Sequence, residues 1–131
     1  MTVQFIINQP PQFTRDSSGQ IISVLLIGKR IFTRMTQITI DNNDANPTQG
    51  QLNKSSIKGT IDATASEFSQ VCNAVEGMLP GETRTLEIEG TEDPTTFSVS
   101  HVRVLVPGAR VASHITALRP GGDGTGTGTE G

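Results

Sequence analysis

The stretch Ile21–Ile40, IISVLLIGKRIFTRMTQITI, decides the character of the fold. Residues 21–27 are almost continuously apolar, which predicts a strand that is buried on both faces. Gly28-Lys-Arg30 is typical of a tight turn. Residues 31–40 then predict a long strand with one apolar face that carries Phe32, Ile38 and Ile40. We expect the two strands to form a hairpin.

The composition also favours a β-rich protein. The hydrophobic share of 34% is below the usual level, and 14 Gly with 7 Pro indicate many turns. Thr is abundant beside Val and Ile, and β-branched side chains pack well on a pleated surface. Further strands are expected over residues 57–61, 83–89, 97–106 and 111–118.

One helix stands out from these strands. Thr64-Ala-Ser-Glu67 matches a capping box, in which the Thr hydroxyl accepts from an early helical N–H and Glu67 reaches back. The apolar residues that follow fall on one helical face, and they are Phe68, Val71, Cys72, Val75 and Leu79. Because Pro80-Gly81 stops the pattern, we predict an amphipathic helix over residues 65–79.

These elements predict a β-rich α+β protein, a compact antiparallel sandwich or barrel of about six strands with that single helix. Residues 13–119 are expected to form one domain. Residues 1–12 predict an extended N-terminal arm, because Pro10-Pro11 breaks a short alternating strand over residues 3–8. Residues 120–131 predict a flexible Gly/Thr-rich tail, since they have no apolar face to bury. The polar stretch from Asp41 to Ser55 predicts a long loop.

The arm and the tail are the candidate partner-binding segments. An arm can add a strand to the sheet edge of a neighbouring subunit, and a Gly-rich tail can lie close to the backbone of a partner. The candidate contact residues are Val3, Phe5, Ile7, Phe13, Arg119, Gly121 and Gly122.

Charge is unevenly distributed along the chain, whose net charge is −3. Residues 1–60 carry six bases and three acids, whereas residues 61–93 carry eight acids and one base. Residues 94–119 carry three bases and no acid, and the tail carries two acids. Such blocks can steer copies or partners together. Alternatively, the fold interleaves the segments and the blocks cancel.

No catalytic, cofactor or metal site is predicted. His101 and His114 lie on neighbouring predicted strands around Pro107-Gly108, but a metal site needs at least one more ligand, so a cross-strand polar pair is favoured. The single cysteine, Cys72, rules out an internal disulfide and is expected to be a buried, unreactive thiol. The stretch Asp41–Asn46 lacks the Gly and Glu that a calcium loop requires.

The sequence therefore favours a non-enzymatic structural protein of a larger assembly, most concretely a bacteriophage virion component such as a capsid decoration (cement) protein. Expected partners are further copies of the chain, as a trimer or ring, and a capsid shell. No membrane partner is expected, because the longest apolar stretch is too short to span a bilayer. The N-terminus lacks the features of a secretion signal, so the protein is expected in the virion or in the cytoplasm of the producing cell.

An alternative is a small nucleic-acid-binding module that resembles an oligonucleotide-binding barrel and uses Lys29, Arg30 and Arg34. Nucleic acid is the less favoured partner, because the chain has no Trp or Tyr to stack on bases. A ligand-binding module or enzyme is a third alternative, and it would need a pocket rich in His, Asp or Glu.

Overall fold

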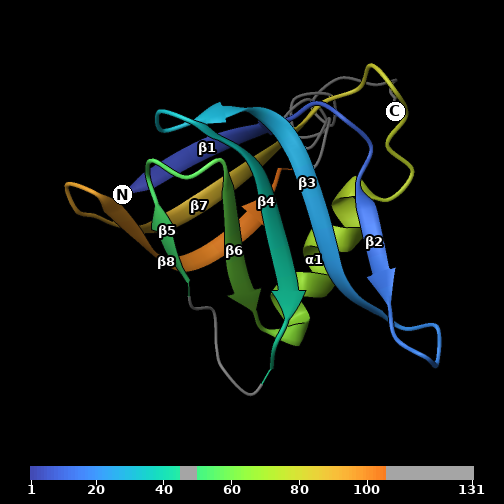
Figure 1. Cartoon of the computed structure of the whole chain (residues 1–131). Coiled ribbons are helices and arrows are strands. Elements are labelled where there is room, and N and C mark those ends of the chain that lie inside the picture. The colour runs from blue at the N-terminus through green and yellow to red at the C-terminus, as the bar shows by residue number, and fades with distance from the viewer. Residues whose placement is uncertain (45–49, 106–131) are drawn as a thin grey trace, which may run out of the picture.

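The computed structural model describes residues 1–44 and 50–105. This part of the chain forms eight strands and one helix (Figure 1). In chain order these are β1 (Thr2–Ile7), β2 (Gln12–Arg15), β3 (Ile21–Ile31), β4 (Met35–Asn42), β5 (Gln51–Asn53), β6 (Lys58–Ala63), α1 (Ala65–Val75), β7 (Arg84–Glu92) and β8 (Thr96–Val104).

The strands form a nearly closed, barrel-like sheet. Seven of them follow the order β5-β8-β7-β1-β3-β4-β6, and β2 pairs with β3 beside this path. The two ends of the path approach each other, because the Leu52 side chain of β5 packs against Gly59 of β6. A β-rich sandwich or barrel of about six strands with one helix was expected. The structure confirms the β-rich character, the barrel-like sheet and the helix among the described residues, but it has eight strands there.

The expected antiparallel pairing is wrong for one pair of strands. β4 and β6 run parallel, with Ile38 opposite Gly59 and Ile40 opposite Ile61. Parallel neighbours need a long crossover connection, and the chain provides one in residues 43–57. This connection includes β5, which crosses to pair with β8. The stretch that was expected to be one long loop therefore contains the end of β4 and a short strand.

The prediction that residues 1–12 form an extended arm is wrong for residues 2–7. β1 lies inside the sheet between β7 and β3, and all six of its residues pair with β7. Phe5 and Ile7 are completely buried in the core of their own chain. The alternation that predicted an arm filling a neighbour's pockets is the alternation of an interior strand. After Pro10-Pro11 the chain forms β2, a short strand that sequence analysis did not predict.

The β3–β4 hairpin exists, but its turn lies at residues 32–34 and not at Gly28-Lys-Arg30. Gly28 belongs to β3 and faces Ile7 of β1, where a Cβ atom would overlap the carbonyl oxygen of Ile6. Here glycine permits a close strand approach rather than a turn. β3 is buried mainly on one face, since Val24 and Leu26 are fully buried whereas Ile22 is 40% exposed.

The predicted helix begins where expected and ends earlier. Thr64 caps α1, because its Oγ1 accepts from the N–H of Glu67 at 3.2 Å. The helix ends at Val75, and Gly77 then adopts a left-handed conformation with φ of 82°. This turn buries Met78 and leaves Leu79 62% exposed, so the expected burial of Leu79 is wrong.

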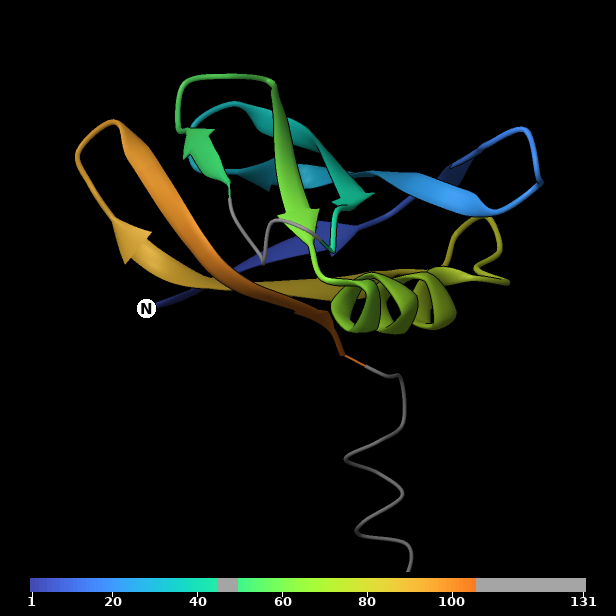
Figure 2. The same ribbon diagram turned by 90° about the horizontal axis from the view of Figure 1, so that it is seen from below.

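The helix packs against β8, β4 and β6, at the side of the barrel away from the β3–β4 hairpin turn (Figure 2). Phe68, Val71 and Val75 supply its buried face, and they join a core made by the inward residues of the strands. Within the described residues, no helix is long and apolar enough to cross a membrane. The predicted strand 111–118, the turn at Pro107-Gly108 and the tail lie outside the described residues.

Candidate functional site

An open groove of about 360 Å³ lies between α1 and the outer face of β7 and β8. The alternation of β7 and β8 places apolar residues inside the barrel and charged residues outside, and α1 adds polar side chains from its first turns. We call this surface the α1–β8 groove. It is lined by Glu67 and Gln70 of α1, Glu87 and Glu89 of β7, and His101 and Arg103 of β8.

Most charged groups of the α1–β8 groove are paired within the chain. His101 Nδ1 lies 3.2 Å from Glu67 Oε2, which links β8 to α1. Arg103 Nη2 lies 2.7 Å from Glu87 Oε1, and the Gln4 side-chain amide donates to Glu87 Oε2 at 3.2 Å. The hydrogen bonds from Arg103 and then from Gln4 lower the pKa of Glu87 below its ordinary value. These contacts hold the groove in one arrangement.

Glu89 differs from the other carboxylates of the groove. It is exposed, it lies opposite His101 in the β7–β8 register, and it forms no ion pair with another described residue. The groove thus holds three carboxylates against one guanidinium, with the imidazole of His101 beside them. Its surface therefore carries an excess of negative charge.

A second charged surface lies at the β3–β4 hairpin, and we call residues 28–34 the basic tip. Lys29, Arg30 and Arg34 are exposed there, and the segment contains no acid. None of the three cations forms an ion pair with another described residue. The turn between β3 and β4, which carries the basic tip, lies away from α1 (Figure 2).

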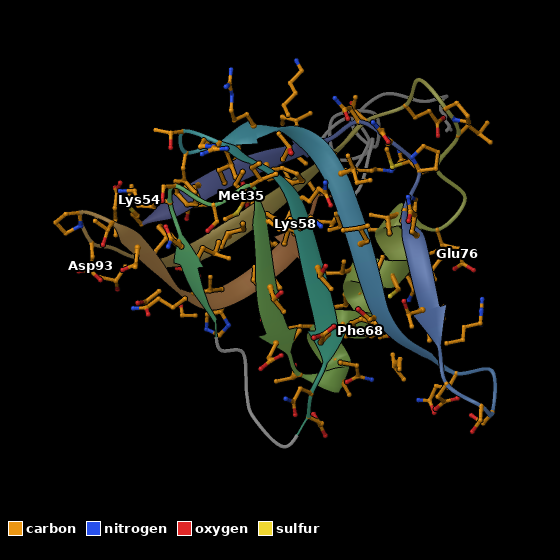
Figure 3. All side chains as sticks on the ribbon, in the orientation of Figure 1. Met35, Lys54, Lys58, Phe68, Glu76 and Asp93 are labelled. Atoms are coloured by element: carbon orange, nitrogen blue, oxygen red, sulfur yellow. The ribbon has the colours of Figure 1, made fainter. Side chains whose placement is uncertain are left out.

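The conformation of the basic tip is accompanied by packing of the Phe32 ring and by a hydrogen bond from Thr33. Phe32 is the one non-glycine residue with a positive φ in the described part of the chain, at 59°. Its ring lies 5.7 Å from the ring of Phe97, and Lys54 Nζ lies 5.9 Å from its centroid. The Thr33 hydroxyl donates to the carbonyl of Lys54 at 3.0 Å, and the Lys54 ammonium pairs with Glu92. Lys54 Nζ also donates to the carbonyl of Asp93 at 3.1 Å, and both of these residues are labelled in Figure 3. These contacts surround a residue whose left-handed conformation is unfavourable for a non-glycine side chain.

The predicted partner-binding residues do not gather at either surface. Phe5 and Ile7 are buried in the barrel, and Val3 packs beside them. Phe13 is partly buried and lines a separate groove of about 430 Å³. Arg119, Gly121 and Gly122 lie outside the described residues.

Cys72 lines the same groove as Phe13 and is partly buried, rather than fully buried as expected. Burial, followed by the nearby charge of Glu76, raises the pKa of Cys72 to about 11. The thiol therefore stays protonated at neutral pH.

The expected pairing of His101 with His114 is not testable, because His114 lies outside the described residues. The structure instead brings His101 against Glu67, a contact that sequence analysis missed. The capping box assigned Glu67 only to the start of the helix, and no local pattern indicated that β8 would pass beside it. Among the described residues, no three His, Cys, Asp or Glu side chains gather in a way that could hold a metal ion.

No protein-family model, no curated protein and no solved structure matches the chain. Its function must therefore be inferred from its own residues. The most distinctive of these form two oppositely charged surfaces on one barrel.

Proposed function

We propose that the protein is a non-enzymatic structural component of a larger protein assembly. The observation that supports this most directly is the separation of charge on a single folded body. Exposed cations that form no ion pair with a described residue occupy the basic tip, and an excess of carboxylates occupies the separate α1–β8 groove. Complementary charged patches steer protein association and fix its orientation.

Within this class, a bacteriophage virion component such as a capsid decoration protein is the concrete type that we propose. A small barrel with separate contact surfaces suits repeated placement on a shell. The Gly/Thr-rich sequence 120–131, together with Arg119, supplies a further candidate contact with such a shell. The proposal does not use the N-terminal strand, because β1 is needed for the sheet.

Light scattering over a range of concentrations and salt tests association directly. We expect a mass above the 13.9 kDa of one chain at low salt, and a fall toward 13.9 kDa at high salt. A variant that lacks only residues 120–131 tests the tail, whereas removing residues 1–12 would delete β1. Co-sedimentation of the protein with phage heads tests the virion assignment. A monomer under every condition that sediments with no shell would contradict the proposal.

A nucleic-acid-binding module remains the second candidate, and the exposed cations of the basic tip are the observation that favours it. Fluorescence anisotropy with labelled single- and double-stranded oligonucleotides tests it. Binding should weaken with salt and with the variant Lys29→Ala/Arg30→Ala. Failure to bind any oligonucleotide at low salt would exclude this candidate.

A further inference from the structure

We propose that the basic tip of one copy docks in the α1–β8 groove of a second copy. This inference rests on the proposed function as an assembly component, and it names the partner and both contact surfaces. The partner is the chain itself, because the chain carries both halves of a complementary pair.

Charge complementarity is the first argument for this contact. The basic tip presents Lys29, Arg30 and Arg34 with no ion pair to another described residue. The groove presents Glu89, which forms no ion pair with a described residue, beside the further carboxylates of Glu67 and Glu87. Guanidinium groups match carboxylates in geometry as well as in charge.

Pre-organisation is the second argument. The basic tip is fixed by the Phe32–Phe97 ring contact and by the hydrogen bond from Thr33, so the backbone loses little freedom on docking. The groove is fixed by the contacts His101–Glu67 and Arg103–Glu87. Two surfaces that are already ordered bind at a smaller entropic cost than two flexible ones.

The placement of the two surfaces bears on the kind of assembly. In Figure 2 the turn that joins β3 to β4 lies away from α1, so the basic tip is expected to reach the α1–β8 groove of another copy rather than its own. If two neighbouring copies make this contact once, it is heterologous and produces a closed ring or an open chain. If they make it reciprocally, it produces a two-fold dimer, and the mass in solution distinguishes the two.

A charge-swap experiment with the full chain tests the contact. The tip variant is Lys29→Glu/Arg30→Glu/Arg34→Glu, and the groove variant is Glu89→Lys/Gln70→Lys. Both sets of positions are exposed, and the groove variant leaves the Glu87–Arg103 pair intact. The matched control is Lys58→Glu, which reverses a neighbouring exposed charge on β6 that lies outside the basic tip. Far-UV circular dichroism checks that each variant is folded.

Light scattering at low salt gives the readout. We expect each variant alone to lose association by about tenfold or more, and the Lys58→Glu control to match the wild type. An equimolar mixture of the two variants should associate again, because each supplies the charge that the other lacks. Loss of association without rescue in the mixture would overturn the proposed contact.

The outcomes separate this inference from the proposed function. If the wild type associates and neither charge swap changes its mass, the contact is wrong and the assembly function stands. If the wild type is always monomeric and binds no shell, the proposed function fails as well. If neither charge swap changes the mass and the tip variant alone loses binding to an oligonucleotide, the basic tip binds phosphate and the contact is wrong.

Discussion

The basic tip and the α1–β8 groove are both charged, but among the described residues only in the groove do the charged side chains form ion pairs with one another. In the groove, charged side chains from α1, β7 and β8 pair with one another. At the basic tip, the cations form no ion pair with the described residues, and the backbone and the Phe32 ring supply the order. Charges in the groove therefore contribute to the folded state, whereas charges at the tip remain available to another molecule.

The largest effect is expected where the hairpin that carries the basic tip crosses β1. In the variant Gly28→Ala, the new Cβ would overlap the carbonyl oxygen of Ile6, so the strands must separate. We expect a loss of about 3 kcal/mol in the free energy of unfolding, measured by urea denaturation. Gly19→Ala is the control, since its φ of 89° is strained but its Cβ meets no atom within 4 Å. For Gly19→Ala we expect a loss of about 1 kcal/mol in the free energy of unfolding. Equal losses for the two variants would contradict the steric explanation.

A smaller effect is expected at Phe32, where ring packing opposes backbone strain. Phe32→Ala removes the contact with Phe97 and keeps a left-handed non-glycine residue, so we expect a loss of about 2 kcal/mol. Phe32→Gly also removes the ring, but it relieves the strain and should be about 1 kcal/mol more stable than Phe32→Ala. Urea denaturation measures both variants. If Ala is the more stable replacement, the left-handed conformation does not strain the tip.

On the groove side, the N-cap of α1 gives the next test. Thr64→Ala removes the acceptor for the N–H of Glu67, and we expect a loss of about 1 kcal/mol. Ser66→Ala is the matched control in the same helical turn, because its exposed side chain makes no hydrogen bond with a described residue. Thermal denaturation followed by circular dichroism compares the two. A similar loss for both would mean that the cap does not set the start of the helix.

Several elements were predictable because their signals are local. The capping box at Thr64 indicated the start of α1, and the alternation of Leu86 and Ile88 with Glu87 and Glu89 indicated the faces of β7. These patterns depend on neighbours within a few residues. The structure accordingly confirms the type and approximate position of these elements.

Other features depend on residues that are distant in the sequence. An alternating strand such as β1 has the same pattern whether it completes its own sheet or that of a neighbour. In the sequence alone, Gly28 indicated a turn. Its observed role, the close approach of β3 to the backbone of Ile6, can be recognised only once β1 has been placed beside β3. Phe32 gave no turn signal, since the ring contact with Phe97 is what stabilises its positive φ. The contact between Glu67 and His101 likewise needs the final packing of α1 on β8.

The smallest effect is expected in the pH dependence of stability, which tests the pairing of Glu87 in the α1–β8 groove. Arg103 and Gln4 lower the pKa of Glu87 in the folded state below the ordinary value of about 4.3 that applies to the unfolded chain. Glu87 therefore stabilises the fold above about pH 4.3, and this contribution is lost as the pH falls through its folded pKa.

The variant Glu87→Gln should consequently lose less stability than the wild type between about pH 6 and about pH 3. Glu89→Gln is the matched control two residues along β7, because Glu89 has no ion pair with a described residue and the Glu87–Arg103 pair stays intact in this variant. Because the chain lacks Trp and Tyr, urea midpoints are followed by far-UV circular dichroism rather than by fluorescence. If both variants lose the same part of the pH dependence of stability, the pairing of Glu87 with Arg103 does not distinguish the contribution of Glu87 from that of Glu89. The groove would then resemble the basic tip, and Glu87 would be as available to a partner as Glu89.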